Sequence, residues 1–245
     1  SVLNKIRDQS APDAIVDTMW DYGYWVKYVA ERRVSGDGGT LSTHVHHWLG
    51  RALVTPSERE SIGMLRMLNC GSDATPQPEG RQGAYGKIVA RLSDPIAAVA
   101  LVTQLAGLDE SSARAALAAR GFSAEEQADV LRSTHCRPPE SFLLLTTEQL
   151  TTATTWMQFG RWDFQRAYIA EAARSQPQAE LVPQLVERFG YSREQAAALY
   201  DQARGLRSQR EREDFAASRT WPEIPEPVLP PWTRMLSTWP SRPPI

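Results

Sequence analysis

The stretch of residues 148–215 constrains the fold most, because apolar side chains recur along it at the spacing of helix faces. The pattern is interrupted at Gly160, near Pro177 and at Gly190, and glycine and proline are residues that commonly end helices. The stretch therefore predicts several consecutive helices. A chain with so long a helical stretch is expected to be dominated by helices.

Two short runs depart from the helical pattern. Residues 14–19 and 141–147 are rich in apolar residues and too short for a typical helix. Runs of this kind are typical of buried strands, which occur in parallel sheets covered on both faces. We therefore expect an α/β fold that is helix-dominated and has a small, mostly parallel sheet. The alternative is an all-α fold.

Two capping patterns indicate where helices begin. Ser123 is followed by Glu126, which is the spacing of a capping box. Thr55 is followed by Pro56 and Glu58, so we expect Thr55 to be the N-cap of the next helix.

Composition and charge limit the class of protein. The 245 residues are 42% hydrophobic, which is enough for a sizeable core. Residues 220–245 hold eight of the 17 prolines and three tryptophans, so we expect one domain over residues 1–219 and a proline- and Trp-rich tail, residues 220–245, packed on it. The apolar runs fall far short of the roughly 20 residues of a membrane span. The net charge of −2 argues against a nucleic-acid partner.

The chain has two cysteines, Cys70 and Cys136. Two are too few for a zinc site made of thiolates alone. They would form one disulfide in an oxidising compartment and stay as buried free thiols in a reducing one. The cysteine count by itself leaves both alternatives open.

The densest aromatic segment is Met19-Trp20-Asp21-Tyr22-Gly23-Tyr24-Trp25. The simpler interpretation places these side chains in the core, with Asp21 as the N-cap of a helix. The functional interpretation rests on hydrogen bonding, because the indole N–H of Trp20 only donates and the carboxylate of Asp21 only accepts. Together they match a hydroxyl group, which does both.

Residues 20–24, Trp-Asp-Tyr-Gly-Tyr, resemble the Trp-Trp-Asp-Tyr-Gly signature of the catalytic subunit of oligosaccharyltransferases, namely the bacterial PglB and archaeal AglB enzymes and their eukaryotic counterpart. Asp37-Gly38-Gly39 follows where that family has an Asp-Gly-Gly or Asp-Asn loop. Residues 142–159 and the Gly-Arg-Trp-Asp-Phe run at 160–164 are similar to its second conserved strand and helix. The resemblance covers residues 1–166 and implies the soluble C-terminal domain of such an enzyme.

The resemblance implies roles for the signature residues. The family's Trp and Asp bind the Thr or Ser hydroxyl at the +2 position of the acceptor sequon Asn-x-Thr/Ser, a role that falls here to Trp20 and Asp21, with Tyr22 and Gly23 shaping the helix start. Met19 stands where the family has its first Trp, which removes one indole donor. A site that bonds a hydroxyl rejects an analogue without one, because its polar groups are then left unpaired.

The family also has a short helical motif that packs against the same sequon side chain. By the resemblance Gln149 and Thr152 occupy its positions, although neither matches the family's residues there, and Thr152 is placed near the sequon methyl group. The implied location is the periplasmic or extracellular face of the membrane. That compartment is oxidising and favours a disulfide between Cys70 and Cys136.

The resemblance places the chemistry of glycan transfer outside these residues. In the family, a divalent Mn or Mg ion, its acidic ligands and the polyprenyl-linked oligosaccharide are held by a large membrane domain. We therefore expect no cofactor in this fragment. The implied partners are its own transmembrane domain, the acceptor polypeptide and, through the parent enzyme, the lipid-linked oligosaccharide. The parent would be an oligosaccharyltransferase and the isolated chain would be inactive.

A histidine cluster suggests a different site. In Thr43-His44-Val45-His46-His47, His44 and His47 share a helix face and would allow a weak surface metal site. A solvated helix face is the simpler interpretation, because ligand sets usually need three converging groups.

The main alternative function is a helical interaction scaffold without catalysis, indicated by the helical patterns at 156–173, 180–189 and 192–204. The segment around Trp20 and Asp21 separates the two functions. A scaffold has no need to expose it, whereas an acceptor-binding domain must.

Overall fold

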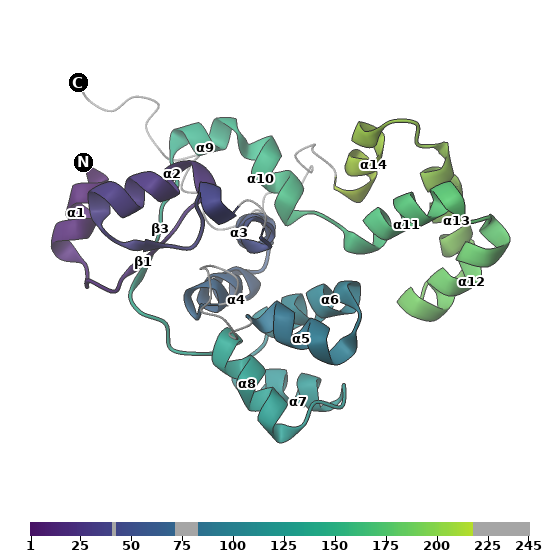
Figure 1. Cartoon of the computed structure of the whole chain (residues 1–245), viewed down its shortest axis with the longest axis horizontal. Helices are drawn as coiled ribbons and strands as arrows, with labels where there is room; N and C mark the ends of the chain where they lie inside the picture. Colours follow the sequence, from purple (N-terminus) through teal and green to yellow (C-terminus); the bar gives the residue numbers. More distant parts are fainter. Residues whose placement is uncertain (41–42, 72–82, 218–245) are drawn as a thin grey trace. The chain divides into compact units, whose positions relative to one another are not determined.

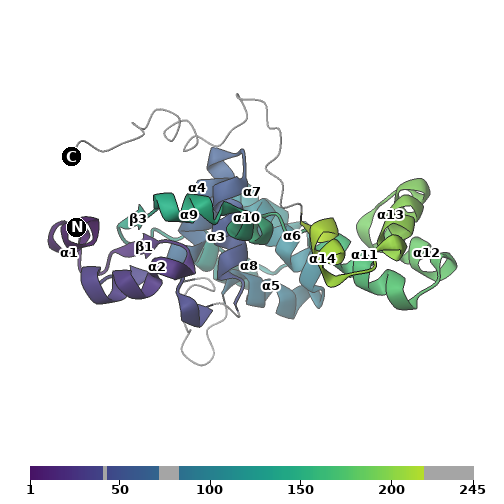
Figure 2. The same cartoon turned by 90° about the horizontal axis from the view of Figure 1, so that it is seen from above.

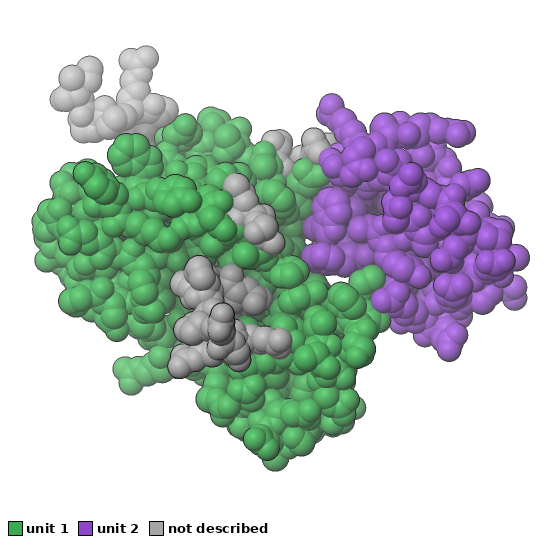
Figure 3. Space-filling model, viewed as in Figure 1, with its two compact units in different colours: residues 1–160, 222–245 green, residues 161–221 purple. Residues whose placement is uncertain are grey.

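The computed structural model describes residues 1–40, 43–71 and 83–217 of the chain. These residues divide after Gly160 into two compact units, unit 1 and unit 2, which Figure 3 colours green and purple. The stretch expected to form one domain, residues 1–219, thus contributes to two units. The expected tail, residues 220–245, lies outside the described residues.

Unit 1 contains a small parallel sheet with the strand order β2-β1-β3. β1 (Ile15–Asp17) pairs with β2 (Arg33–Val34) on one side and with β3 (Ser141–Leu143) on the other. All three residues of β1 are buried, as befits the central strand. The sheet and the many helices of the chain (Figure 1) confirm the helix-dominated α/β fold, and the all-α alternative is wrong.

Each strand leads at its carboxyl end into a segment that passes over the same edge of the sheet. β1 is followed by α2 (Trp20–Trp25) and the π-helix η1 (Val26–Ala30). β2 is followed by the 3-10 helix η2 (Gly38–Thr40), and β3 by α9 (Thr147–Thr151). The carboxyl ends of parallel strands meet at one edge, where α/β proteins commonly bind ligands. Three segments distant in the sequence therefore meet at this edge.

Helix α3 (Val45–Val54) packs against α10 (Ala153–Gly160), and the two helices lie side by side in both Figure 1 and Figure 2. A Cβ on Gly160 would lie 2.2 Å from the carbonyl carbon of Gly50. A Cβ on Gly50 would lie 2.7 Å from the amide nitrogen of Gly160. The two backbones therefore touch at a point that only glycine allows.

The other helices of unit 1 pack around α4, which contacts α3, α6 and α8, while α5 contacts α6 and α8. Helix α1 packs on η1 instead, next to the sheet. The bounds of these helices are α1 (Val2–Gln9), α4 (Glu58–Asn69), α5 (Ala84–Leu92), α6 (Pro95–Ala106), α7 (Glu110–Ala118) and α8 (Ala124–Thr134).

The two expected helix starts differ in outcome. Ser123 and Glu126 form the expected capping box at the start of α8. The expectation for Thr55 is wrong, because its N–H bonds to the carbonyl of Arg51 and so ends α3. Ser57 is the N-cap of α4 instead, and its hydroxyl accepts the N–H of Glu60.

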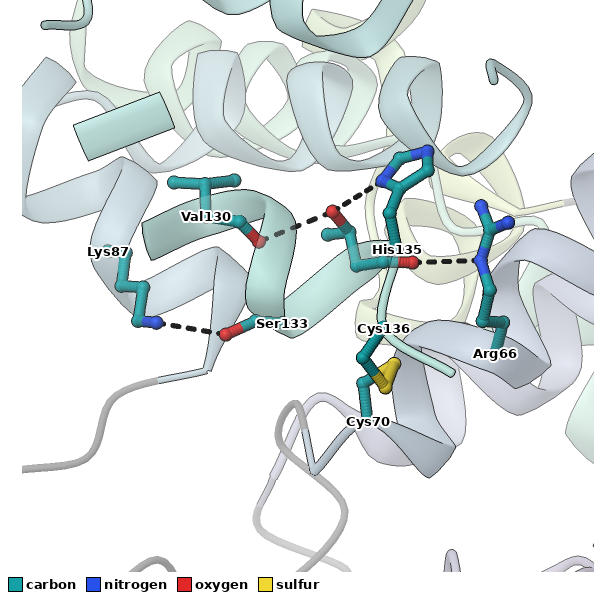
Figure 4. Close-up of a disulfide and its surroundings, with 8 residues drawn as sticks. Arg66, Cys70, Lys87, Val130, Ser133, His135 and Cys136 are labelled. Carbon is teal, nitrogen blue, oxygen red and sulfur yellow. Dashed lines mark hydrogen bonds between the residues drawn. A yellow bond between two sulfur atoms is a disulfide. The ribbon is translucent and has the colours of Figure 1, made fainter. Parts of the chain in front are cut away.

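A disulfide joins Cys70 and Cys136, whose Cα atoms lie 5.8 Å apart. It links the end of α4 to the segment after α8, as Figure 4 shows. Next to it, Nε of Arg66 donates a hydrogen bond of 3.0 Å to the carbonyl oxygen of Thr134. The covalent bond and this hydrogen bond hold α4 and α8 together at one point.

Unit 2 has its own helical core. Ile169, Leu181, Leu185 and Tyr200 are among the buried side chains that form it. The break expected at Gly190 is confirmed, since this residue ends α12 with a φ of 72°. The described helices of unit 2 are α11 (Phe164–Ser175), α12 (Gln178–Phe189), α13 (Arg193–Gly205) and α14 (Gln209–Ala216). None of the described helices of either unit has the length and apolar content needed to cross a membrane.

Candidate functional site

Hydrogen bonds fasten α9 to the start of α2 at the carboxyl edge of the sheet. The side-chain amide of Gln149 donates to the hydroxyl of Thr18 at 3.1 Å, and the hydroxyl of Tyr22 donates to the carboxylate of Glu148 at 2.5 Å. The hydrogen bond to Glu148 is the main cause that raises the pKa of Tyr22. These bonds join residues more than 120 positions apart at the same edge of the sheet.

Trp20 and Asp21 occupy the first turn of α2, at the surface of this edge. Trp20 is partly buried, and the carboxylate of Asp21 is exposed. Within the described part of the chain, neither the indole N–H of Trp20 nor the carboxylate of Asp21 has a hydrogen-bond or ion-pair partner. One donor and one acceptor are therefore adjacent and available to a ligand.

Met19, rather than Asp21, is the N-cap of α2, and it makes no side-chain capping bond. The interpretation of Asp21 as an N-cap is therefore wrong, and its carboxylate is not used by the helix start. Met19 itself is 2% exposed and belongs to the core. Its side chain is not part of the accessible surface beside Trp20.

The loop after β2 packs closely against α2. A Cβ on Gly23 would lie 2.3 Å from the carbonyl oxygen of Gly36, so the contact requires glycine. Asp37 accepts the N–H of Gly39 at 2.8 Å and forms an ion pair with Lys27 of η1. Burial by itself would raise the pKa of Asp37, but the hydrogen bonds from Lys27 and Gly39 outweigh it and lower that pKa below its usual value. Asp37 is therefore ionised and held in place.

His46 of α3 supports Trp20 from within the unit. It is 2% exposed, and its Nε2 lies 3.2 Å from the hydroxyl oxygen of Thr40. That hydroxyl gives its only hydrogen to the carbonyl of Asp37 at 2.7 Å, so His46 must donate through Nε2–H. Burial lowers the pKa of His46 to about 4, although the charge of Asp37 acts in the opposite direction. The ring is therefore neutral at pH 7.

The other two histidines of the cluster point to different partners. Nδ1 of His47 donates to the carbonyl oxygen of Phe159 at 2.8 Å, and burial lowers the pKa of His47 to about 4. The ring of His44 lies 4.2 Å from that of Tyr85. His44 and His47, for which a solvated helix face was expected, are both half-buried, and His46 is buried. Among the described residues, no group of three or more His, Cys, Asp or Glu side chains could hold a metal ion.

The site lies in the part of the chain that known proteins share. A family model described as the STT3/PglB/AglB core domain matches residues 12–166, which is more than half of the chain. The chain belongs to this family. A core domain of this kind had been expected from the resemblance of residues 20–24, and the match confirms that expectation.

Relatives of this STT3/PglB/AglB core domain include two proteins named dolichyl-phosphooligosaccharide-protein glycotransferase. The one from Methanocaldococcus jannaschii is 29% identical over 165 residues and the one from Methanococcus voltae is 27% identical over 165 residues. Each match covers 66% of this chain and 17% of the relative, so the chain spans about a sixth of their length.

One solved structure also matches the chain, the crystal structure of the C. jejuni PglB C-terminal domain. The match has a TM-score of 0.36 and 16% sequence identity, and it covers 64% of this chain and 51% of that one.

Within the core domain, the expected site residues differ in their exposure to solvent. Trp20, Asp21 and Tyr22 gather at the sheet edge, whereas Gln149 is 1% exposed and uses its amide internally. Thr152 is exposed, and its hydroxyl donates to the carbonyl of Gln149 at 3.2 Å.

His46 and Phe159 contact Trp20 at this edge, and the sequence analysis assigned neither residue a role there. The helical period offered a signal for His46. It shares a face with Leu49, Gly50 and Leu53, at steps of three, four and seven residues, and these three residues are buried.

Proposed function

We propose that this core domain is the acceptor-recognition part of an oligosaccharyltransferase, with Trp20 and Asp21 binding the Thr or Ser hydroxyl at the +2 position of the sequon Asn-x-Thr/Ser. The observation that carries the proposal is the adjacent, unengaged donor and acceptor of these two residues at the sheet edge. An indole N–H and a carboxylate together satisfy both hydrogen-bonding capacities of one hydroxyl. A hydrogen bond to the ionised Asp21 would be the stronger of the two.

The departure at Met19 affects the strength of this site. Met19 is buried, so the site offers one indole where the family's signature has a second Trp next to it. We propose that recognition here rests on Trp20 and Asp21, with Tyr22 fastened to Glu148 so that the first turn of α2 keeps its position. Gln149 of α9 then acts by holding Thr18. Thr152, which follows the end of α9, would lie beside the acceptor side chain.

The remaining parts of the proposal concern the longer protein. Its membrane domain would hold the polyprenyl-linked oligosaccharide and the divalent Mn or Mg ion, since no fitting set of acidic and histidine ligands occurs among the described residues. The disulfide supports a periplasmic or extracellular position for this domain, because disulfides persist in oxidising compartments. The isolated chain would bind acceptor and transfer nothing.

The proposal is tested by NMR titration of the 245-residue chain with two peptides, Ac-Asn-Ala-Thr-NH2 and Ac-Asn-Ala-Val-NH2. Valine has the shape of threonine but lacks the hydroxyl. We expect the Thr peptide to bind about tenfold more tightly, as a charge-assisted hydrogen bond predicts. Trp20→Phe and Asp21→Asn should each bring the two affinities to within about twofold of each other.

A matched control variant tests whether the preference for the Thr peptide depends on Trp20 or on any exposed tryptophan of α2. Trp25 is 60% exposed on the same helix, so Trp25→Phe should keep the preference for the Thr peptide. Equal affinities for the two peptides in the wild-type chain would contradict the proposal and favour the alternative function, a helical interaction scaffold without catalysis. Glycan transfer by the chain alone, supplied with lipid-linked oligosaccharide and Mn, would contradict its assignment as a recognition domain.

A further inference from the structure

Three aromatic rings from three helices meet at the base of the site. The ring of His46 in α3 lies 5.0 Å from that of Trp20 in α2, at an interplanar angle of 81°. The ring of Phe159 in α10 lies 5.7 Å from that of Trp20, at 83°. His46 and Phe159 are themselves 6.3 Å apart. The indole thus has edge-to-face contacts with two rings, which restrict its rotation.

Of the two supporting rings, only His46 carries a hydrogen bond. Its Nε2–H donates to Thr40, and Thr40 also accepts the N–H of Asp37 at 3.0 Å. Thr40 is therefore the point where His46 is joined to the loop that packs on Gly23 of α2. This bond fixes the orientation of the imidazole, and the imidazole in turn contacts Trp20.

The Nδ1 atom of His46 is buried and has no hydrogen-bond partner among the described residues. An unpaired buried acceptor lowers stability, and a phenyl ring of similar shape would avoid that loss. Among the described residues, the imidazole therefore carries a local cost that a phenyl ring would not.

We propose that His46 is a positioning residue, which holds the indole of Trp20 at the orientation that lets its N–H and the carboxylate of Asp21 reach the same acceptor hydroxyl. This inference rests on the proposed function, because it assigns the hydroxyl preference of that site to a residue that does not touch the acceptor. The donor of Trp20 is rigid within its ring, so a change in ring orientation moves the N–H relative to Asp21.

Two substitutions separate the ring of His46 from its hydrogen bond. His46→Gln keeps a donor near the position of Nε2 but removes the ring, and His46→Phe keeps a ring but removes the donor. Thr40→Val leaves both rings in place and removes the acceptor of His46. His44→Gln is the matched control on the same helix, because the ring of His44 lies against Tyr85.

The first readout needs no peptide. The indole N–H resonance of Trp20, identified by its loss in Trp20→Phe, should shift in His46→Gln, His46→Phe and Thr40→Val and stay in place in His44→Gln. The second readout is the ratio of affinities for the Thr and Val peptides. We expect it to fall from about tenfold to about twofold in the His46 variants, while the unfolding midpoint shows that they remain folded.

The outcomes distinguish this inference from the function beneath it. If the wild-type chain shows no preference for the Thr peptide, the proposed function fails, while an indole shift in Thr40→Val, which leaves the imidazole in place, would still show that His46 orients Trp20. If the preference exists and survives in His46→Gln, His46→Phe and Thr40→Val, the positioning role is wrong and His46 is a packing residue. If the substitutions at His46 prevent folding, Thr40→Val decides by the same two readouts.

Discussion

At the scale of single residues, Asp17 shows what burial at the end of β1 does to a carboxyl group. It is 1% exposed, and Nδ2 of Asn69 donates to it at 2.8 Å. Burial raises the pKa of Asp17 to about 7, and the hydrogen bond from Asn69 offsets only part of this effect. The folded chain therefore binds a proton at Asp17 between pH 4 and pH 7 that the unfolded chain has released. Asp17 then makes the folded state less stable as the pH rises through this range.

The substitution Asp17→Asn should remove this dependence. We expect the free energy of unfolding of Asp17→Asn, relative to wild type, to rise by roughly 2–4 kcal/mol between pH 4 and pH 8, because the variant buries no charge. Urea unfolding of both chains at several pH values measures the difference, in which contributions from other groups cancel. Parallel pH profiles for the two chains would show that Asp17 keeps an ordinary pKa.

Residue-scale prediction from the sequence worked where the chemistry was local. Trp20 and Asp21 stood out because a donor and an acceptor are adjacent in the chain. His46 did not, because its role depends on Trp20 and Thr40, which the fold brings to it. The cluster Thr43 to His47 is mostly polar in composition. His46 differs from the other histidines of the cluster because it lies on the buried face of α3.

At the scale of elements, the contact between α3 and α10 depends on two glycines. Gly160→Ala would place a Cβ 2.2 Å from the backbone of Gly50, so the helices must separate. We expect a loss of about 1–3 kcal/mol in the free energy of unfolding, as for other overpacked sites. The indole resonance of Trp20 should also shift, because α3 carries His46 and α10 carries Phe159.

The matched control for this prediction is Gly205→Ala. A Cβ on Gly205, at the end of α13, meets no atom within 4 Å. Alanine favours a helix over glycine by about 1 kcal/mol, so this variant should be neutral or more stable. Equal stabilities of the two variants in urea unfolding would mean that the α3–α10 contact is looser than described.

Elements were predictable where their signals lie within a few residues. Ser123 with Glu126 gave the start of α8, and the apolar runs gave β1 and β3. β2 was missed because it has only two residues, and its pairing with Val16 defines it more than its composition does. Thr55 was misassigned because Ser57, two residues later, offers a competing cap.

At the scale of the whole molecule, sequence patterns predicted the helix-dominated fold, and the division into two compact units is a separate finding of the structure. One domain over residues 1–219 was expected because the proline-rich composition changes only at residue 220. The division after Gly160 follows from contacts, because α11, α12, α13 and α14 share a core with one another. Contacts of this kind are not encoded in any short stretch of sequence.

The disulfide between Cys70 and Cys136 leads to a prediction about the molecule as a whole. It closes a loop over a sequence separation of 66 residues, and in the chain-entropy account such a bond stabilises the folded state by about 4 kcal/mol. Intact mass after unfolding with an alkylating agent should show no modified thiol without reductant and two with it. Two modified thiols without reductant would contradict the bond and remove its support for an oxidising compartment.

Reduction should also act unevenly along the chain. Both cysteines lie in unit 1, whereas the core of unit 2 is built from its own helices. Hydrogen exchange followed by mass spectrometry should therefore show the largest increase on reduction in peptides from α4 and α8, which the bond joins, and the smallest in α11 and α13. Cys70→Ser together with Cys136→Ser should reproduce the effect without reductant. A uniform increase in exchange over both units would mean that the two units unfold together. In that case the loss of the disulfide would lower the free energy of opening of every amide by the same amount.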